Sequence, residues 1–170
     1  MPAYTACAIK TSFAFDLEAF LADFSVPDQD LRSDLARALE RWQAELTAAL
    51  LRAGRRQLLL VCLGNRAEKE AGEGWDKAPY RTFLRASLAQ ALCMGLAGQI
   101  IPQLEETGCA PVPRPTPTLA SALSQLGAPY LRFDAATLSR RFSLLTPYPF
   151  QGACEICFLR QGCPGPRKRD

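Results

Sequence analysis

The chain contains no histidine among its 170 residues. The side chain that most often acts as a general base at neutral pH is therefore missing, which excludes Ser-His-Asp and Cys-His mechanisms of nucleophilic catalysis. Any bound zinc would need thiolate or carboxylate ligands alone. No other pair of residues in the sequence marks a catalytic centre, so the sequence favours a protein that is not an enzyme.

Long apolar runs are missing too. The longest, LLLVCL at 58–63, is far shorter than the roughly 20 residues that span a bilayer. The N-terminal residues MPAYTACAIKTSFAFD lack the basic start and apolar segment of a secretory signal. The seven cysteines are an odd number, so thiols that stay reduced or bind a metal are expected rather than a disulfide framework. We therefore expect a soluble, cytoplasmic protein with no membrane partner.

Charge gives little guidance to partners. The formal net charge is only +3, whereas a dedicated nucleic-acid binder usually gathers a stronger basic bias on one face. The basic residues Arg167, Lys168 and Arg169 near the end of the sequence could contact phosphates or could simply be a solvated tail. A protein partner is the expectation, with nucleic acid open through these three residues.

Two long helices dominate the expected fold. Apolar residues recur every three or four positions from 31 to 50, at Leu31, Leu35, Leu39, Trp42, Leu46 and Leu50. This spacing predicts an amphipathic helix with Pro27 in its first turn and Gly54 just past its end. A second long helix is predicted from Pro79 to about Thr107, with Pro102 kinking or ending it.

Shorter elements surround these helices. A strand is expected at 3–10, a helix capped by Asp16, an exposed loop at 66–78, a helix from Thr116 to Gly127, an extended segment at 128–133 and a helix from Asp134 to about Phe142. Residues 55–65 fit either a buried strand or an apolar helix. The expected fold class is mainly α, with room for one or two short strands and an irregular Cys-rich C-terminal segment. Residues 1–150 form the predicted helical domain, with a Pro-rich linker at 108–118, and 151–170 a metal-binding segment packed on it.

Three of the seven cysteines lie close together, at Cys154, Cys157 and Cys163. Two thiolates separated by two residues can bind one metal centre. The next five residues allow the chain to turn back, so that a third thiolate can bind the same centre. Cys163-Pro164 is similar to the Cys-Pro that closes ligand runs in bacterial ferredoxins. Zinc ribbons usually present two separated Cys-x2-Cys pairs, and only one is present here. The spacing therefore favours an iron–sulfur cluster, with zinc as the alternative.

A complete site generally needs four ligands. Cys62 and Cys93 lie in apolar segments, where a free cysteine behaves as a small hydrophobe. Cys109 opens the Pro-rich linker, and Cys7 would tie the N-terminus to the C-terminus. We place Cys109 ahead of Cys7 as the fourth ligand.

The three-cysteine run, preceded by TPYPFQGA at 146–153, resembles the cluster-binding end of the iron–sulfur exonucleases associated with CRISPR systems and of AddB-type recombination nucleases. In those families a remote upstream cysteine completes a [4Fe–4S] staple, which the resemblance implies here for Cys7 or another upstream thiol. Such nucleases also hold a catalytic metal with an Asp and a Glu-x-Lys or similar pair, and neither Glu-x-Lys nor Gln-x-Lys occurs in this sequence. The resemblance therefore supports a cluster and gives no support to nuclease chemistry.

The expected function is that of a [4Fe–4S]-binding protein with an accessory role in electron transfer, redox sensing or metallocofactor maturation. Two alternatives remain open at this point. One is a nucleic-acid-associated protein in which the cluster is a structural staple. The other is a zinc-stabilised protein-interaction module.

Overall fold

The computed structural model describes residues 3–10 and 12–163. Within these residues the elements are, in order, β1 (Thr5–Ile9), α1 (Leu17–Asp23), α2 (Gln29–Glu45), β2 (Thr47–Ala53), β3 (Arg56–Cys62), α3 (Asn65–Gly72), α4 (Pro79–Ile100), α5 (Gln103–Thr107), α6 (Pro117–Gln125), β4 (Tyr130–Arg132), β5 (Thr137–Leu138) and β6 (Ser143–Pro147). No helix in this part of the chain is long and apolar enough to cross a membrane.

The predicted mainly α fold class is wrong. In the described part of the chain, a four-stranded antiparallel sheet and a two-stranded sheet accompany six helices, and 42% of the chain is helical. The main error is the helix predicted to run to Gly54, because α2 ends at Glu45 and β2 begins two residues later. Leu46 and Leu50 are four residues apart, a spacing that fits one face of a helix and equally one face of a strand. Gly54 has a φ of 60°, and it serves as the first residue of the two-residue β2–β3 turn, where such a φ is required.

The strand β3 lies inside the larger sheet, whose order is β1-β2-β3-β6. On one side of it, Leu59 and Val61 join the core formed with α2, α3 and α4. On the other side, Leu58 and Leu60 pack with Leu119 and Leu123 of α6. Because both of its faces are buried, the strand is apolar at successive positions, as the LLLVC run is. This resolves the choice between strand and helix for residues 55–65.

Two further predictions are wrong. The stretch 66–78, expected to be an exposed loop, forms α3 as far as Gly72, because Ala67 and Ala71 lie one turn apart and are both fully buried. The helix expected from Asp134 to Phe142 does not form. Ala136 has a φ of 50°, which is incompatible with a helix, and Thr137–Leu138 pairs with β4 instead.

Several local predictions are confirmed. The strand expected at 3–10 is β1, and the Asp16 carboxylate accepts a hydrogen bond from the Ala19 amide at the start of α1. The Thr116 hydroxyl accepts one from the Leu119 amide at the start of α6. The second long helix, α4, ends at Ile100, two residues before Pro102. Local capping groups and proline therefore act where the sequence suggested.

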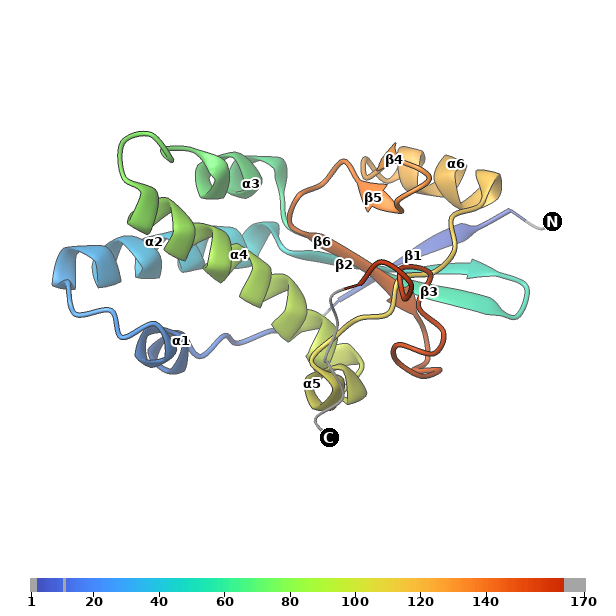
Figure 1. The fold of residues 1–170 in the computed structure, drawn as a ribbon, viewed down its shortest axis with the longest axis horizontal. Helices are drawn as coiled ribbons and strands as arrows, with labels where there is room; N and C mark the ends of the chain where they lie inside the picture. Colours follow the sequence, from blue (N-terminus) through green and yellow to red (C-terminus); the bar gives the residue numbers. More distant parts are fainter. Residues whose placement is uncertain (1–2, 11, 164–170) are drawn as a thin grey trace.

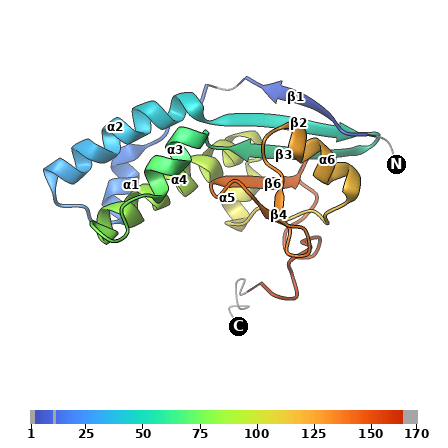
Figure 2. The same ribbon diagram turned by 90° about the horizontal axis from the view of Figure 1, so that it is seen from above.

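The elements separate into two ends (Figures 1 and 2). Helices α1 to α4 gather at one end, while the sheet continues past them towards α6 and the β2–β3 turn. The last described residues form loops beside the sheet, close to the linker between α5 and α6. This arrangement brings the linker cysteine and the C-terminal cysteines to one region of the molecule.

Candidate metal-binding site

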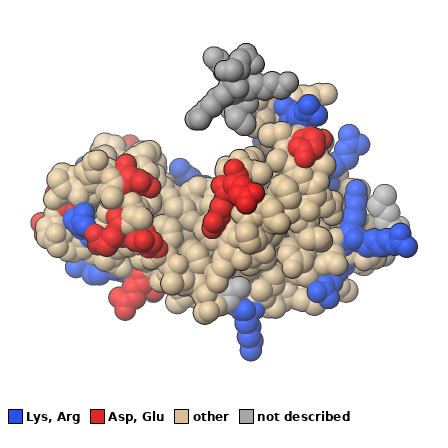
Figure 3. All heavy atoms as spheres, turned by 90° about the horizontal axis from the view of Figure 1, so that it is seen from below, with Lys and Arg blue, Asp and Glu red and all other residues tan. Residues whose placement is uncertain are grey.

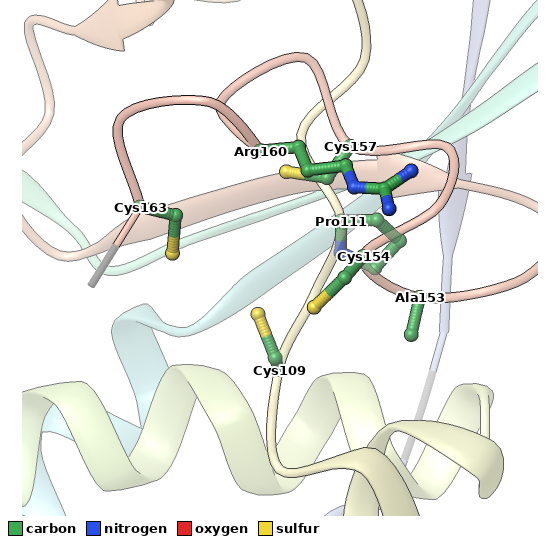
Figure 4. A pocket seen from close by; sticks show the side chains of 7 residues that line it. All are labelled: Cys109, Pro111, Ala153, Cys154, Cys157, Arg160 and Cys163. Atoms are coloured by element: carbon green, nitrogen blue, oxygen red, sulfur yellow. The ribbon is translucent and has the colours of Figure 1, made fainter. Parts of the chain in front are cut away.

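Four cysteines line one pocket of about 180 Å³. Cys109 comes from the linker, and Cys154, Cys157 and Cys163 come from the C-terminal segment; Pro111, Ala153 and Arg160 complete the lining. In Figure 4 the four sulfur atoms surround a common space rather than pointing apart. The structure therefore brings together the four residues that the sequence analysis favoured as ligands.

The end of α5 positions Cys109. Gly108 caps this helix with a left-handed φ of 62°, and its amide donates a hydrogen bond to the Leu104 carbonyl. The Thr107 hydroxyl then donates to the Cys109 carbonyl at 3.0 Å. A residue with a side chain is strained at such a φ, so the glycine lets the chain leave the helix sharply. The sharp exit directs the linker, and with it Cys109, towards the C-terminal segment.

Consecutive turns position the other three thiols. The Cys157 amide donates to the Cys154 carbonyl at 3.4 Å, and the Arg160 amide donates to the Cys157 carbonyl at 3.2 Å. The two residues between Cys154 and Cys157 thus form a single turn, as the sequence spacing suggested. Gly162 adds another turn through its amide, which donates to the Leu159 carbonyl at 3.1 Å, and Cys163 follows directly.

Two hydrogen bonds attach this segment to the linker through Val112. The Phe158 amide donates to the Val112 carbonyl at 2.8 Å. The Val112 amide in turn donates to the Cys157 sulfur at 3.4 Å. Backbone N–H groups aimed at ligand sulfurs are a common feature of metal–thiolate sites, where they stabilise negative charge on the sulfur. No sequence pattern could have indicated this role of Val112, because a backbone amide is common to nearly every residue type.

The pocket changes the acid–base behaviour of the Cys109 thiol. Burial, and then the neighbouring thiols of Cys154, Cys157 and Cys163, raise the pKa of Cys109. The metal-free pocket therefore favours a protonated Cys109. A bound metal reverses this preference, because its positive charge stabilises the thiolate. Arg160 also lines this pocket, where its guanidinium adds positive charge near the thiols.

The sulfurs are arranged around a cavity and not around a point. In the described residues, no three His, Cys, Asp or Glu side chains are close enough together to hold a single metal ion. In a zinc site each ligand sulfur lies about 2.3 Å from the metal. The pocket between these sulfurs measures about 180 Å³, whereas roughly 10–15 Å³ is enough to hold a water molecule. Among the described residues the four thiols therefore share one cavity without forming a ready-made site for a single ion.

The remaining cysteines lie outside this pocket. Cys62 and Cys93 are buried in the core, and burial raises the pKa of Cys62 to about 11 and that of Cys93 to about 12. The Cys93 thiol donates a hydrogen bond to the Phe142 carbonyl at 3.3 Å, so both behave as the small hydrophobic residues expected from the sequence. Cys7 is exposed on β1. The basic residues Arg167, Lys168 and Arg169 lie outside the described residues.

Comparisons with known proteins supply no relative from which a role could be transferred. No protein-family model matches the chain, no curated protein matches it, and no solved structure matches it. The function therefore rests on the chemistry of the pocket itself.

Proposed function

We propose that this chain binds a [4Fe–4S] cluster through Cys109, Cys154, Cys157 and Cys163 and serves as an accessory protein in electron transfer, redox sensing or metallocofactor maturation. One observation carries the proposal: four thiols from two segments distant in the sequence line a single pocket. Four cysteine thiolates are the usual ligand set of such a cluster. The cavity that the four thiols share has room for more than a single ion, which supports a cluster over a zinc ion.

The surroundings of the pocket support a redox-active cluster. When bound, the cluster supplies a centre that accepts and releases one electron. The Arg160 guanidinium and the Val112 amide both stabilise negative charge at the sulfurs, which favours the reduced state. Cys154 and Cys163 are exposed, so one side of the pocket opens to the surface, where a partner protein can approach for electron exchange.

Anaerobic purification tests the proposal directly. The protein is expected to be brown, with iron and acid-labile sulfide in equal amounts and a broad visible absorption that dithionite bleaches. Cys157→Ala should abolish iron retention, whereas Cys62→Ala, which removes a buried thiol outside the pocket, should leave it intact. A colourless protein with stoichiometric zinc would contradict the cluster, and equal iron contents in the two variants would contradict the ligand assignment.

A matched pair of variants tests the fourth ligand. Cys109→Ser alters the thiol that faces the other three, and Cys7→Ser alters the exposed thiol on β1. We expect Cys109→Ser to lose most of its iron and Cys7→Ser to retain all of it, as measured by iron analysis after gel filtration. The reverse result would show that the upstream ligand is Cys7.

A further inference from the structure

A second pocket, of about 250 Å³, lies at the end of the sheet near the β2–β3 turn. Its polar lining consists of Tyr4, Arg56, Gln57, Arg114 and Gln151. None of these residues lines the cysteine pocket, and none was singled out by the sequence. Two arginines, two glutamines and a tyrosine thus contribute to the wall of one small cavity.

The sheet topology explains how these distant residues meet. Arg56 is the first residue of β3 and pairs with Ala53. Tyr4 directly precedes β1, whose Thr5 pairs with Arg52, so Tyr4 lies at the same end of the sheet. Arg114 arrives from the linker, where its guanidinium lies over the Phe158 ring at 5.9 Å from the centroid. Packing therefore holds Arg114 beside the pocket.

Within the described part of the chain, the positive charges at this end have no carboxylate partners. Among the described residues, the ion pairs involve none of Arg52, Arg55, Arg56, Arg114 and Arg160. The helical end carries more acidic than basic residues. Its residues 16–45 and 64–85 contain twelve Asp or Glu and eight Lys or Arg, which gives a net charge of −4. Figure 3 shows acidic side chains over the helical end and basic ones along the opposite end. The small net charge of the whole chain hides this separation, which attracts anions to the sheet end.

The chemistry of the lining selects among anions. Unpaired guanidinium groups are the preferred partners of phosphate oxygens. A tyrosine ring offers a face on which an aromatic base can stack, and side-chain amides can both donate to and accept from the edge of a base. We propose that this pocket binds a nucleotide, with Arg56 and Arg114 on the phosphate and Tyr4 against the base. The proposed ligand is a single nucleotide, free or as a unit of a single strand.

Binding measurements with three probes test this proposal. Isothermal titration with AMP and with inorganic phosphate compares a nucleotide with the bare anion, and fluorescence anisotropy with a labelled oligoadenylate of about ten nucleotides tests a single strand. We expect AMP or the oligoadenylate to bind at least about tenfold more tightly than inorganic phosphate, because stacking on Tyr4 adds to the phosphate contacts. The tighter of the two identifies the source of the nucleotide. Equal binding of all three probes, or no binding of AMP and the oligoadenylate, overturns the proposal.

Neighbouring arginines provide a matched control. Arg56→Ala should weaken nucleotide binding about tenfold, the usual cost of losing one charged hydrogen bond. Arg55→Ala removes the same charge from the adjacent exposed residue, which does not line the pocket, and should change binding less than about twofold. Tyr4→Leu keeps an apolar side chain but removes the ring, so it should weaken nucleotide binding and leave phosphate binding unchanged. Equal losses for Arg55→Ala and Arg56→Ala would show attraction by general charge and overturn the assigned site.

This proposal stands apart from the cluster. Iron content measured on each variant reports the state of the cysteine pocket separately. A protein that binds AMP but no iron would support the nucleotide pocket and contradict the cluster, and the opposite result would do the reverse.

Discussion

The two ends of this molecule are held together by different interactions. At the helical end, Leu35 and Trp42 of α2 and Leu88 of α4 are almost completely buried in the core that the helices share with one face of the sheet. At the cysteine end, residues 150–163 contain no helix or strand, and most are exposed or half-buried. Hydrophobic burial stabilises the first end, whereas a few backbone hydrogen bonds hold the second, where four free thiols line one pocket. A bound metal would therefore matter for the second end and little for the first.

The comparison also separates the roles of the two ends. A chain of this length can bury enough apolar surface to fold without a metal, and the helical end and the sheet supply that surface. The loops of the cysteine end have few buried side chains of their own. Loops positioned by a rigid scaffold commonly carry functional groups, and the cysteine pocket lies among these loops.

The same substitution made at a buried leucine of the helical end and at an exposed leucine of β4 should give the largest difference. Leu35→Ala empties a fully buried site in α2, which we expect to lower the free energy of unfolding by about 2–5 kcal/mol. Leu131→Ala alters a side chain that is 71% exposed and should change it by less than about 0.5 kcal/mol. Urea denaturation followed by circular dichroism measures both. Similar losses in the two variants would show that burial does not distinguish these regions.

Removal of the metal should instead affect the cysteine end and leave the helical end unchanged. Stripping iron from the purified protein with ferricyanide and a chelator should speed amide hydrogen exchange at 153–163 about tenfold or more, because the loops lose their cross-link to the linker. Exchange in α2 and α4 should remain unchanged, since their cores contain no ligand. Mass spectrometry of peptides from each region gives the comparison. A uniform increase across the chain would mean that the metal supports the whole fold.

The sequence predicted the local features of this fold better than its long-range ones. The capping residues Asp16 and Thr116 act on amides three positions away, so a short window contains all the information needed. The helix-to-strand change after Glu45 depends instead on β2 pairing with both of its neighbours. No local pattern records that pairing, and the apolar spacing of Leu46 and Leu50 fits both structures.

The candidate sites show the same limit. The turn between Cys154 and Cys157 follows from their spacing alone, but the approach of Cys109 depends on how the linker leaves α5. The second pocket could not be predicted at all. Tyr4 and Arg114 are about 110 positions apart in the sequence, with Arg56 between them. The register of the strands brings Tyr4 and Arg56 together, and the path of the linker brings Arg114 to them.

The smallest predicted effect concerns an ionic network at the helical end. The Glu70 carboxylate accepts hydrogen bonds from Arg41 at 2.9 Å, from the Trp42 indole at 3.0 Å and from Arg66 at 3.1 Å. These bonds lower the pKa of Glu70 from 4.5 to about 2, and the bond from Arg41 makes the largest contribution. Glu70→Gln should therefore cost about 1 kcal/mol of unfolding free energy at neutral pH, as measured by urea denaturation.

The pH dependence of that loss distinguishes a charge effect from a packing effect. Between pH 4.5 and about 2, Glu70 is protonated in the unfolded chain but still ionised in the folded protein. The stabilisation that the ionic network supplies is therefore present above this range and disappears as the pH falls through it. The difference between Glu70→Gln and the unaltered protein should vanish over the same range. Glu73→Gln, whose carboxylate is 63% exposed and 3.7 Å from Lys69, is the control and should differ by only a few tenths of a kcal/mol. A Glu70→Gln deficit that persists at the acidic end would mean that side-chain packing, and not the ionic network, stabilises this part of the helical end.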